Sequence, residues 1–453
     1  MNIPLNGRVA IIDDKEDEAL PLIKLLAKNR IPYVFYKGTD PEFLPEENDK
    51  AQNDIRLLFL DLNLLGGGSP SDKDIQEALY AVLNKVISKN NFPYLIILWS
   101  RQEKKYTAVV EELFNDRLAD RKPIDIVSFV KSDVFPTSGE VGDIDLLKEI
   151  NNRLIKESGY RYLLNWENQV HKSADVTLQS VFSSYHSFTN WTDNANYIFN
   201  KLSYSYLGGH FKPSTIGEKI RGGYQAFNSV FLDSLETLSA NVVIDNPHEL
   251  KYEIDNVNVD TKYSINKKLL LTEDNLVFNY PGSIIYDTDP AQKGFYNDLV
   301  SKCISHQYIK HKVSVGNSEL SPEDMILQSR TIHKEIMDSI RKDYFKIHCF
   351  VTPLCDFIQK NNNKFDRIVS GLVIAEDQKM FVDDKHESLF VSPSFELDGK
   401  PYFLVIDFRC FHTSAITASA YQKATFRIRQ QLLAEIQSKL ARHINRQGIL
   451  FID

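Results

Sequence analysis

Four segments decide the fold of the N-terminal part of the chain: VAIIDD at residues 9–14, LLFLD at 57–61, LIILWS at 95–100 and IVSFVK at 126–131. Continuous apolar runs of this length are typical of parallel strands that are covered on both faces. A further short run lies at 33–36, and helical patterns lie near 16–29, 72–88, 104–114 and 144–157. Strands that alternate with helices predict a (βα)5 doubly wound parallel sheet.

The rest of the sequence predicts two more regions. From about 160 to 239 aromatic and aliphatic residues recur without strand punctuation, which indicates a helical middle region, either a subdomain core or a dimerisation or signal-transmission bundle. Beyond 262 strand-like runs return at 268–272, 283–286, 348–351, 368–374, 389–391 and 402–408, with helical patterns at 322–341 and 420–444. This favours a C-terminal α+β domain with a mostly antiparallel sheet or small barrel. We predict domains over 1–158, 159–245 and 246–453.

Length and composition narrow the class of protein. A chain of 453 residues with 43% hydrophobic and 25% charged residues can form several globular cores. The net charge of -8 argues against nucleic acid coating the whole surface. Four cysteines do not make a disulfide scaffold, and neither a signal sequence nor a membrane span is evident. We expect a cytoplasmic protein that does not associate with membranes.

The polar residues that follow the N-terminal strands indicate chemistry. Asp13 and Asp14 follow the first run, Asp61 follows 57–60, Ser100 ends 95–100 and Lys131 follows 124–130. The carboxyl ends of the strands in such a sheet meet in one crevice, so these side chains are expected together. Three neighbouring carboxylates need a cation, and Mg²⁺ prefers oxygen ligands. A carboxylate beside such an ion can act as a nucleophile toward a phosphoryl group.

This pattern resembles the receiver domain of two-component response regulators, over residues of about 7–158. That family carries an acidic pair after the first strand, a phospho-accepting aspartate after the third, Ser or Thr after the fourth and Lys after the fifth. By this resemblance Asp13 and Asp14 match the metal-binding pair, and Asp61 matches the phosphoacceptor. Asn63 matches the position whose backbone carbonyl completes the Mg²⁺ shell. The resemblance implies that a histidine kinase is the phosphodonor.

The resemblance also covers the residues that would contact the phosphoryl group, with some departures. Ser100 matches the switch hydroxyl, and Lys131 matches the phosphate-contacting lysine. Arg101 stands where receivers normally carry a small residue, so its guanidinium would narrow the pocket or contact the phosphate. Ser128 stands where the family usually carries an aromatic switch residue. Phosphorylation of Asp61 is therefore expected, whereas these departures argue against the usual route by which receivers transmit their phosphorylation to other domains.

Two C-terminal segments carry further candidates. VTPLCDF at 351–357 and VIDFRCFHTS at 405–414 supply Cys355, Asp356, Asp407, Arg409 and His412. Cys355 and His412 would form a nucleophilic pair or, with Cys410, a zinc site, although strong zinc spacing is absent. The two aspartates and Arg409 would form a buried ion pair or the carboxylate site of a nuclease. Structural roles, with the cysteines packing as small hydrophobes, are the alternative.

The predicted C-terminal helix is strongly basic. This helix and its flanks carry six cations and a single carboxylate, Glu435. The cations are Lys423, Arg427, Arg429, Lys439, Arg442 and Arg446. A solvated basic face explains this pattern, and so does contact with nucleic acid or an acidic partner. The spacings of helix-turn-helix and zinc-finger motifs are absent, so an ordinary DNA-binding output is not supported.

Together these observations predict a response-regulator-like signalling protein. Asp61 would be phosphorylated with Mg²⁺, and an atypical C-terminal module, of the kind also found in phage-defence operons, would supply the output. A homodimer is compatible with this reading. Two alternatives stay open, a phosphate-sink or pseudo-receiver interaction protein and an effector hydrolase or nuclease gated by the receiver.

Overall fold

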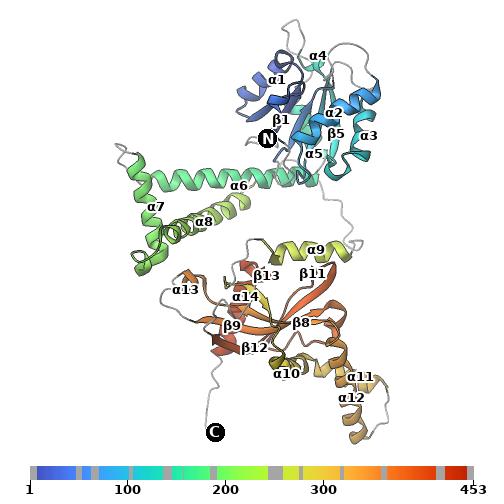
Figure 1. Ribbon diagram of the computed structural model, residues 1–453, viewed down its shortest axis with the longest axis vertical. Coiled ribbons are helices and arrows are strands. Elements are labelled where there is room, and N and C mark those ends of the chain that lie inside the picture. The colour runs from blue at the N-terminus through green and yellow to red at the C-terminus, as the bar shows by residue number, and fades with distance from the viewer. Residues whose placement is uncertain are drawn as a thin grey trace. The chain divides into compact units, whose positions relative to one another are not determined.

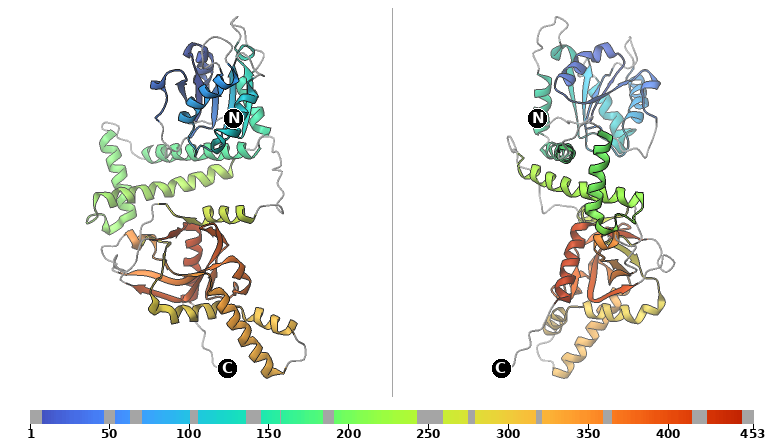
Figure 2. Two further views of the ribbon diagram at one scale, coloured as in Figure 1. Left: turned by 45° about the vertical axis from the view of Figure 1, so that its right-hand side comes forward. Right: turned by 90° about the vertical axis from the view of Figure 1, so that its left-hand side faces the viewer.

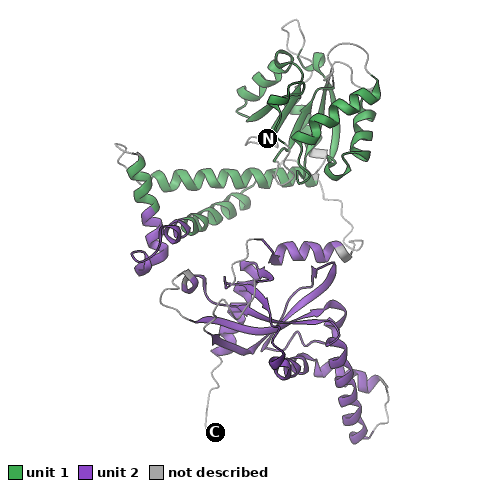
Figure 3. Cartoon of the chain, in the orientation of Figure 1, with its two compact units in different colours: residues 1–199, 224–251 green, residues 200–223, 252–453 purple. Residues whose placement is uncertain are grey.

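The computed structural model describes residues 8–46, 54–62, 71–100, 106–135, 145–156, 158–183, 191–242, 259–274, 279–316, 321–358, 365–414 and 424–445. Asn63 and Arg101 lie outside these ranges. The chain divides into two compact units, 1–199 with 224–251 and 200–223 with 252–453 (Figure 3). Among the described helices, none combines the length and the hydropathy that a bilayer crossing requires.

The N-terminal unit contains a five-stranded parallel sheet with the order β2-β1-β3-β4-β5. Figure 1 labels its strands β1 and β5. Its strands are β1 (Val9–Asp13), β2 (Tyr33–Lys37), β3 (Leu57–Leu60), β4 (Leu95–Ser100) and β5 (Asp125–Val130). Every residue of β1 and β3 is buried. These strands are apolar throughout because helices cover both faces of the sheet. The predicted doubly wound sheet is confirmed.

Alternate residues of each strand enter two separate cores, since successive side chains of a strand point to opposite faces. One core joins Ile12, Leu58 and Ile96 to helices α2 (Asp72–Val86) and α3 (Thr107–Asp116). The other joins Ile11, Phe59 and Trp99 to α1 (Glu16–Lys28), α4 (Lys131–Val134) and α5 (Leu146–Lys156). The views of Figure 2 show the helices on both sides of the sheet. Each core is built mainly of aliphatic and aromatic side chains, and the sheet between them carries the polar residues at its ends.

Helix α6 (Ser158–Ser183) is attached to the end of this sheet where strands β1 and β3 begin. Arg8 precedes β1, Arg56 precedes β3, and both guanidinium groups bind Glu167 of α6, at 2.8 Å and 3.0 Å. The Arg8 guanidinium also lies 2.8 Å from His171. Tyr160 enters the sheet core, and its hydroxyl donates a hydrogen bond to the carbonyl of Arg56. We name the pairing of Arg8 and Arg56 with Glu167 the Glu167 clamp.

Two long helices follow, α7 (Trp191–Leu207) and α8 (Ile216–Ala240). In the first unit the ring of Phe199 packs edge-on against Tyr224 at 5.7 Å. In the second unit Leu207 lies 3.1 Å from the position of a β-carbon built on Gly222, so a larger residue there would have to displace the leucine. The middle region is helical, as predicted.

The second unit contains an eight-stranded, antiparallel, curled sheet among the described residues (Figure 1). Its main path is β10-β12-β9-β8-β7-β13-β6, and β11 pairs with β12. The strands are β6 (Leu271–Thr272), β7 (Ser283–Tyr286), β8 (Tyr344–Phe350), β9 (Asp366–Ala375), β10 (Leu389–Val391), β11 (Phe395–Leu397), β12 (Lys400–Ser414) and β13 (Phe426–Ile428). The pairing of β9 with β12 shifts register between Ile406 and Phe411, as at a β-bulge. Gly371 lies at this point because a β-carbon there would be 2.4 Å from the carbonyl oxygen of Val405.

Helices cover both faces of this second sheet as well. Besides parts of α7 and α8, the described helices of the unit are α9 (Val259–Leu270), α10 (Lys293–Cys303), α11 (His306–Gly316), α12 (Pro322–Ile340), α13 (Leu354–Ile358) and α14 (Gln430–Ile444). One core contains Leu432 and Ile436 of α14, and the other contains Tyr296 and Leu299 of α10. The α+β architecture predicted for this region is confirmed. Residues 268–270, predicted as strand, continue α9, and the predicted helix from 420 begins only at Gln430 because β13 precedes it.

Candidate functional site

Three aspartates lie at the carboxyl ends of two neighbouring strands of the parallel sheet, β1 and β3. Asp13 is the last residue of β1, Asp14 follows it, and Asp61 follows β3. The three residues are almost fully buried, with relative exposures of 0%, 8% and 2%. One carboxylate oxygen from each residue lies within 4.8 Å of the other two. The convergence expected from the sequence is therefore present for all three carboxylates.

Lys131 is the buried cation of this cluster. It begins α4 directly after β5, and its Nζ donates hydrogen bonds to Asp13 Oδ2 at 2.8 Å and Asp61 Oδ2 at 3.0 Å. A third carboxylate, Glu18 of α1, lies 3.6 Å from the same Nζ. Glu18 also binds the ammonium of Lys15 at 3.0 Å, which ties it to the loop after β1. One ammonium group thus links residues from three separate strand ends.

The charges of the cluster shift the pKa values of its members. Burial, and after it the negative charge of Asp61, raise the pKa of Asp13 to about 6, against the opposing effect of Lys131. Burial alone would lower the pKa of Lys131, but the carboxylates of Asp61 and Asp13 outweigh it and raise that pKa. Lys131 therefore remains charged at neutral pH. Its single ammonium group does not fully compensate the negative charge of the neighbouring carboxylates.

The donor set fits a hard divalent cation. Asp14 Oδ1 is buried and has no hydrogen-bond partner within the described part of the chain. A buried oxygen that is left unpaired is costly, and a metal ion would satisfy it. Mg²⁺ binds oxygen at about 2.1 Å and Ca²⁺ at about 2.3–2.6 Å, so ligands on opposite sides of an ion are about 4–5 Å apart. The 4.8 Å limit on the three carboxylate oxygens agrees with this spacing.

Other predicted members of the site are placed less completely. Ser100 ends β4 beside Val130 of β5, so its backbone lies one residue before Lys131 in the paired strand, and its side chain is outside the described part. Ser128 forms a hydrogen bond of 2.9 Å with Thr107 at the start of α3. The position where receivers usually carry an aromatic residue is thus held by a serine in a polar contact.

Sequence reasoning missed Glu18, although its place in the first turn of the helix after β1 was a usable signal.

The two acidic C-terminal candidates form separate ion pairs. Asp356 of α13 lies 3.0 Å from Arg367. Asp407 accepts two hydrogen bonds from the guanidinium of Arg409, at 2.8 Å and 2.7 Å, within β12. His412 Nδ1 lies 3.2 Å from the carbonyl oxygen of Cys410. The side chain of Cys355 lies outside the described part, so its predicted pairing with His412 is untested.

A buried polar network near β8 was not anticipated from the sequence. His348 Nδ1 lies 3.1 Å from Ser370 Oγ on β9, and His348 Nε2 lies 3.4 Å from Asp287 Oδ2 beyond β7. These are the residue types of a hydrolase triad. Ser370 is only 2% exposed, however, and a nucleophilic serine must reach its substrate. We therefore interpret the network as a polar link between neighbouring strands.

Comparison of the chain with protein-family models, with curated proteins and with solved structures gave no match. The function of this chain is therefore inferred from its own geometry. That geometry is a receiver-like α/β fold with the strand order 2-1-3-4-5 and a buried acidic triad at the ligand-binding edge of the sheet.

Proposed function

We propose that the N-terminal domain is a phospho-accepting receiver and that Asp61 takes a phosphoryl group from the phosphohistidine of a histidine kinase. The observation that carries this proposal is the convergence of Asp13, Asp14 and Asp61 on one point, with the Lys131 ammonium bound to Asp61. In an open parallel sheet this edge is the place where ligands bind. The unpartnered oxygen of Asp14 supports a divalent ion, preferably Mg²⁺, as the cofactor.

The proposed reaction needs few protein groups. A carboxylate oxygen of Asp61 forms a bond to phosphorus while the bond from phosphorus to the donor nitrogen breaks. The imidazole leaves with the electron pair and takes a proton from solvent. Lys131, already 3.0 Å from Asp61, is positioned to stabilise negative charge on the transferred group. A divalent ion held by the acidic residues would neutralise charge on the phosphoryl oxygens.

Phosphorylation would also change the contacts of Lys131. The ammonium now holds Asp13 and Asp61 together. A phosphoryl group adds negative charge and three acceptor oxygens to Asp61, so the ammonium would turn from Asp13 toward the phosphate. Lys131 begins α4, and this helix would therefore shift with its first residue. We infer that the remaining domains respond to this change.

The test uses a small phosphodonor, so it does not depend on knowing the kinase. The full-length protein is incubated with phosphoramidate and Mg²⁺, and its intact mass is measured. We expect a gain of one phosphoryl group that hydroxylamine removes, since acyl phosphates react with this nucleophile. Asp61→Asn should abolish the gain. Asp17→Asn, which changes an exposed aspartate of α1, is the matched control and should keep it.

Two results would overturn the proposal. One is the absence of any phosphoryl gain in folded wild-type protein with Mg²⁺ present. The other is a gain that persists in Asp61→Asn, because the phosphoryl group would then lie on another residue. Chelation of the metal by EDTA should prevent phosphorylation, and Asp14→Asn should raise the Mg²⁺ concentration that phosphorylation requires.

A further inference from the structure

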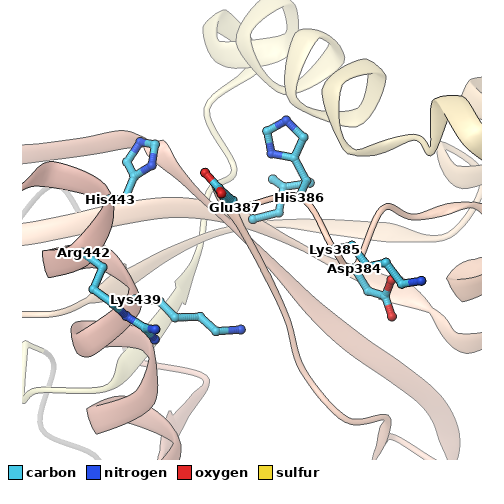
Figure 4. Close-up of a pocket in the computed structure, with 8 residues that line it drawn as sticks. Asp384, Lys385, His386, Glu387, Lys439, Arg442 and His443 are labelled. Atoms are coloured by element: carbon cyan, nitrogen blue, oxygen red, sulfur yellow. The ribbon is translucent and has the colours of Figure 1, made fainter. Parts of the chain in front are cut away.

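A pocket of about 400 Å³ opens in the C-terminal unit, and its lining residue Leu389 is the strand partner of Asp407. One wall is the loop 384–387 with Leu389, the first residue of β10. The other wall is the end of α14, with Lys439, Arg442 and His443. Figure 4 shows the residues of the loop and those of the helix on two sides of this space. The pocket is thus formed by two segments that are about 50 residues apart in the sequence.

Positive side chains line both walls of this pocket. Lys439, Arg442 and His443 share one face of α14 because they are spaced three and four residues apart. Lys385 and His386 belong to the facing loop. The carboxylates that line the pocket are Asp384 and Glu387. Lys385, Lys439 and Arg442 against two carboxylates leave an excess of one positive charge among the lining residues.

The ring of His386 is prepared to donate a hydrogen bond. Its Nδ1 accepts from the backbone N–H of Ser388 at 3.2 Å, and the Ser388 hydroxyl lies 2.8 Å from the same atom. A backbone N–H only donates, so the neutral ring carries its proton on Nε2. Nε2 is therefore a donor even when His386 is uncharged. Such a donor suits an anion and does not suit a cation.

Lys439 is held in place by weak contacts that an anion can replace. Its Nζ lies 5.1 Å above the ring of Phe390 and 3.7 Å from Glu435, one turn earlier in α14. An exposed pair of this type contributes little to stability. Arg442 and His443 also compensate the negative end of the α14 dipole, which explains their presence without a ligand. That role does not explain Lys385 and His386 on the opposite wall.

We propose that this pocket binds a phosphate-bearing small molecule, such as a nucleotide or a sugar phosphate. Its volume of about 400 Å³ lies within the range of small-molecule sites, about 300–1,000 Å³. Arginine, lysine and histidine donors together suit phosphate oxygens. Leu389 offers an apolar surface for the remainder of the ligand. The chain's net charge of -8 disfavours a long nucleic acid as the occupant.

The test is a calorimetric titration of the full-length protein with three probes, ADP, ribose 5-phosphate and adenosine. ADP or ribose 5-phosphate should bind, and adenosine, which has no phosphate, should not. The double variant Lys439→Gln/Arg442→Gln should weaken binding at least tenfold. Lys310→Gln/Lys312→Gln removes the same charge from exposed positions of α11 and should leave the affinity unchanged. Stronger binding of ADP than of ribose 5-phosphate would assign a nucleotide, and the reverse would assign a sugar phosphate.

Three outcomes would overturn the proposal: no binding of either phosphate, equal binding of adenosine, or binding that the α14 double variant does not weaken. Tight binding of a single-stranded oligonucleotide without binding of either small phosphate would also overturn it. Asp61→Asn should not change the affinity. This variant separates the pocket from the receiver, because the two sites share no residue.

Discussion

Replacing Lys131 with methionine should destabilise the N-terminal domain, because the variant leaves Asp13 and Asp61 buried without their shared cation. At the 4.8 Å limit between the carboxylate oxygens, and with an effective dielectric constant of about 20, two charges repel by about 3.5 kcal/mol. Removing one partner of a buried ion pair typically costs about 3–5 kcal/mol. For a domain of this size, about 3.5 kcal/mol corresponds to a melting temperature lower by about 7–14 °C.

Trp99 offers a local reporter for this measurement. It is buried in the sheet core, where its ring packs against Phe59 and Phe135. The chain has three tryptophans, so replacing Trp166 and Trp191 with phenylalanine leaves Trp99 as the sole indole. Its fluorescence during denaturant unfolding, with EDTA present, then reports on the parallel sheet.

Lys24→Met, at an exposed position of α1, is the matched control and should change stability by less than about 0.5 kcal/mol. Adding Asp61→Asn to Lys131→Met should recover part of the loss, because it removes one of the two repelling charges. The loss should also shrink near pH 5, where Asp13 takes up a proton. Two results would refute this prediction. In one, Lys131→Met lowers the stability no more than Lys24→Met does. In the other, the double variant Lys131→Met/Asp61→Asn is less stable than Lys131→Met alone.

Four further predictions concern the acidic site and other parts of the molecule. Burial lowers the pKa of His348 below 6.5, so the unfolded chain binds a proton there that the folded protein does not. The free energy of unfolding of the C-terminal domain should therefore decrease as the pH falls below about 6.5, and His348→Gln should reduce this decrease in urea titrations. Mg²⁺ should raise the melting temperature of the wild type, and Asp14→Asn should abolish that rise; an equal rise in both proteins would contradict the assignment of Asp14. Glu167→Gln should lower the free energy of unfolding of the N-terminal domain by about 1–3 kcal/mol and speed hydrogen exchange in α6, since Arg8 and Arg56 lose a charged acceptor. Unchanged exchange would argue against the Glu167 clamp. Burial raises the pKa of the Cys349 thiol to about 12, so iodoacetamide should alkylate Cys349 only after unfolding, as mass spectrometry would show.

Much of the N-terminal domain could be predicted because its signals are local. The apolar run 57–60 is strand β3, and residues 9–12 form all but the last residue of β1. Once the strands are parallel, Asp13 and Asp61 must lie at the same edge of the sheet. The positions of the acidic residues thus follow from connectivity, without any knowledge of long-range contacts.

Contacts between distant segments could not be predicted in this way. Glu167 binds Arg56 across 111 residues, and a lone glutamate on a helix does not indicate its partner. His348 and Asp287 likewise meet only because β7 and β8 are neighbours. The start of α14 was missed for a different reason. Phe426 and Ile428 alternate with polar residues, which is a strand signal, but three residues are too few to stand out beside a basic helix.

The Glu167 clamp bears on how the N-terminal domain can be isolated for biochemistry. Excision at the end of α5 would remove Glu167 and leave Arg8 and Arg56 without their shared acceptor. It would also remove Tyr160 and Leu164 from the apolar core beneath β1 and β3, so the fragment would tend to aggregate. A fragment that ends after Ser183 keeps all of these groups and is the better choice for solution measurements of the acidic site.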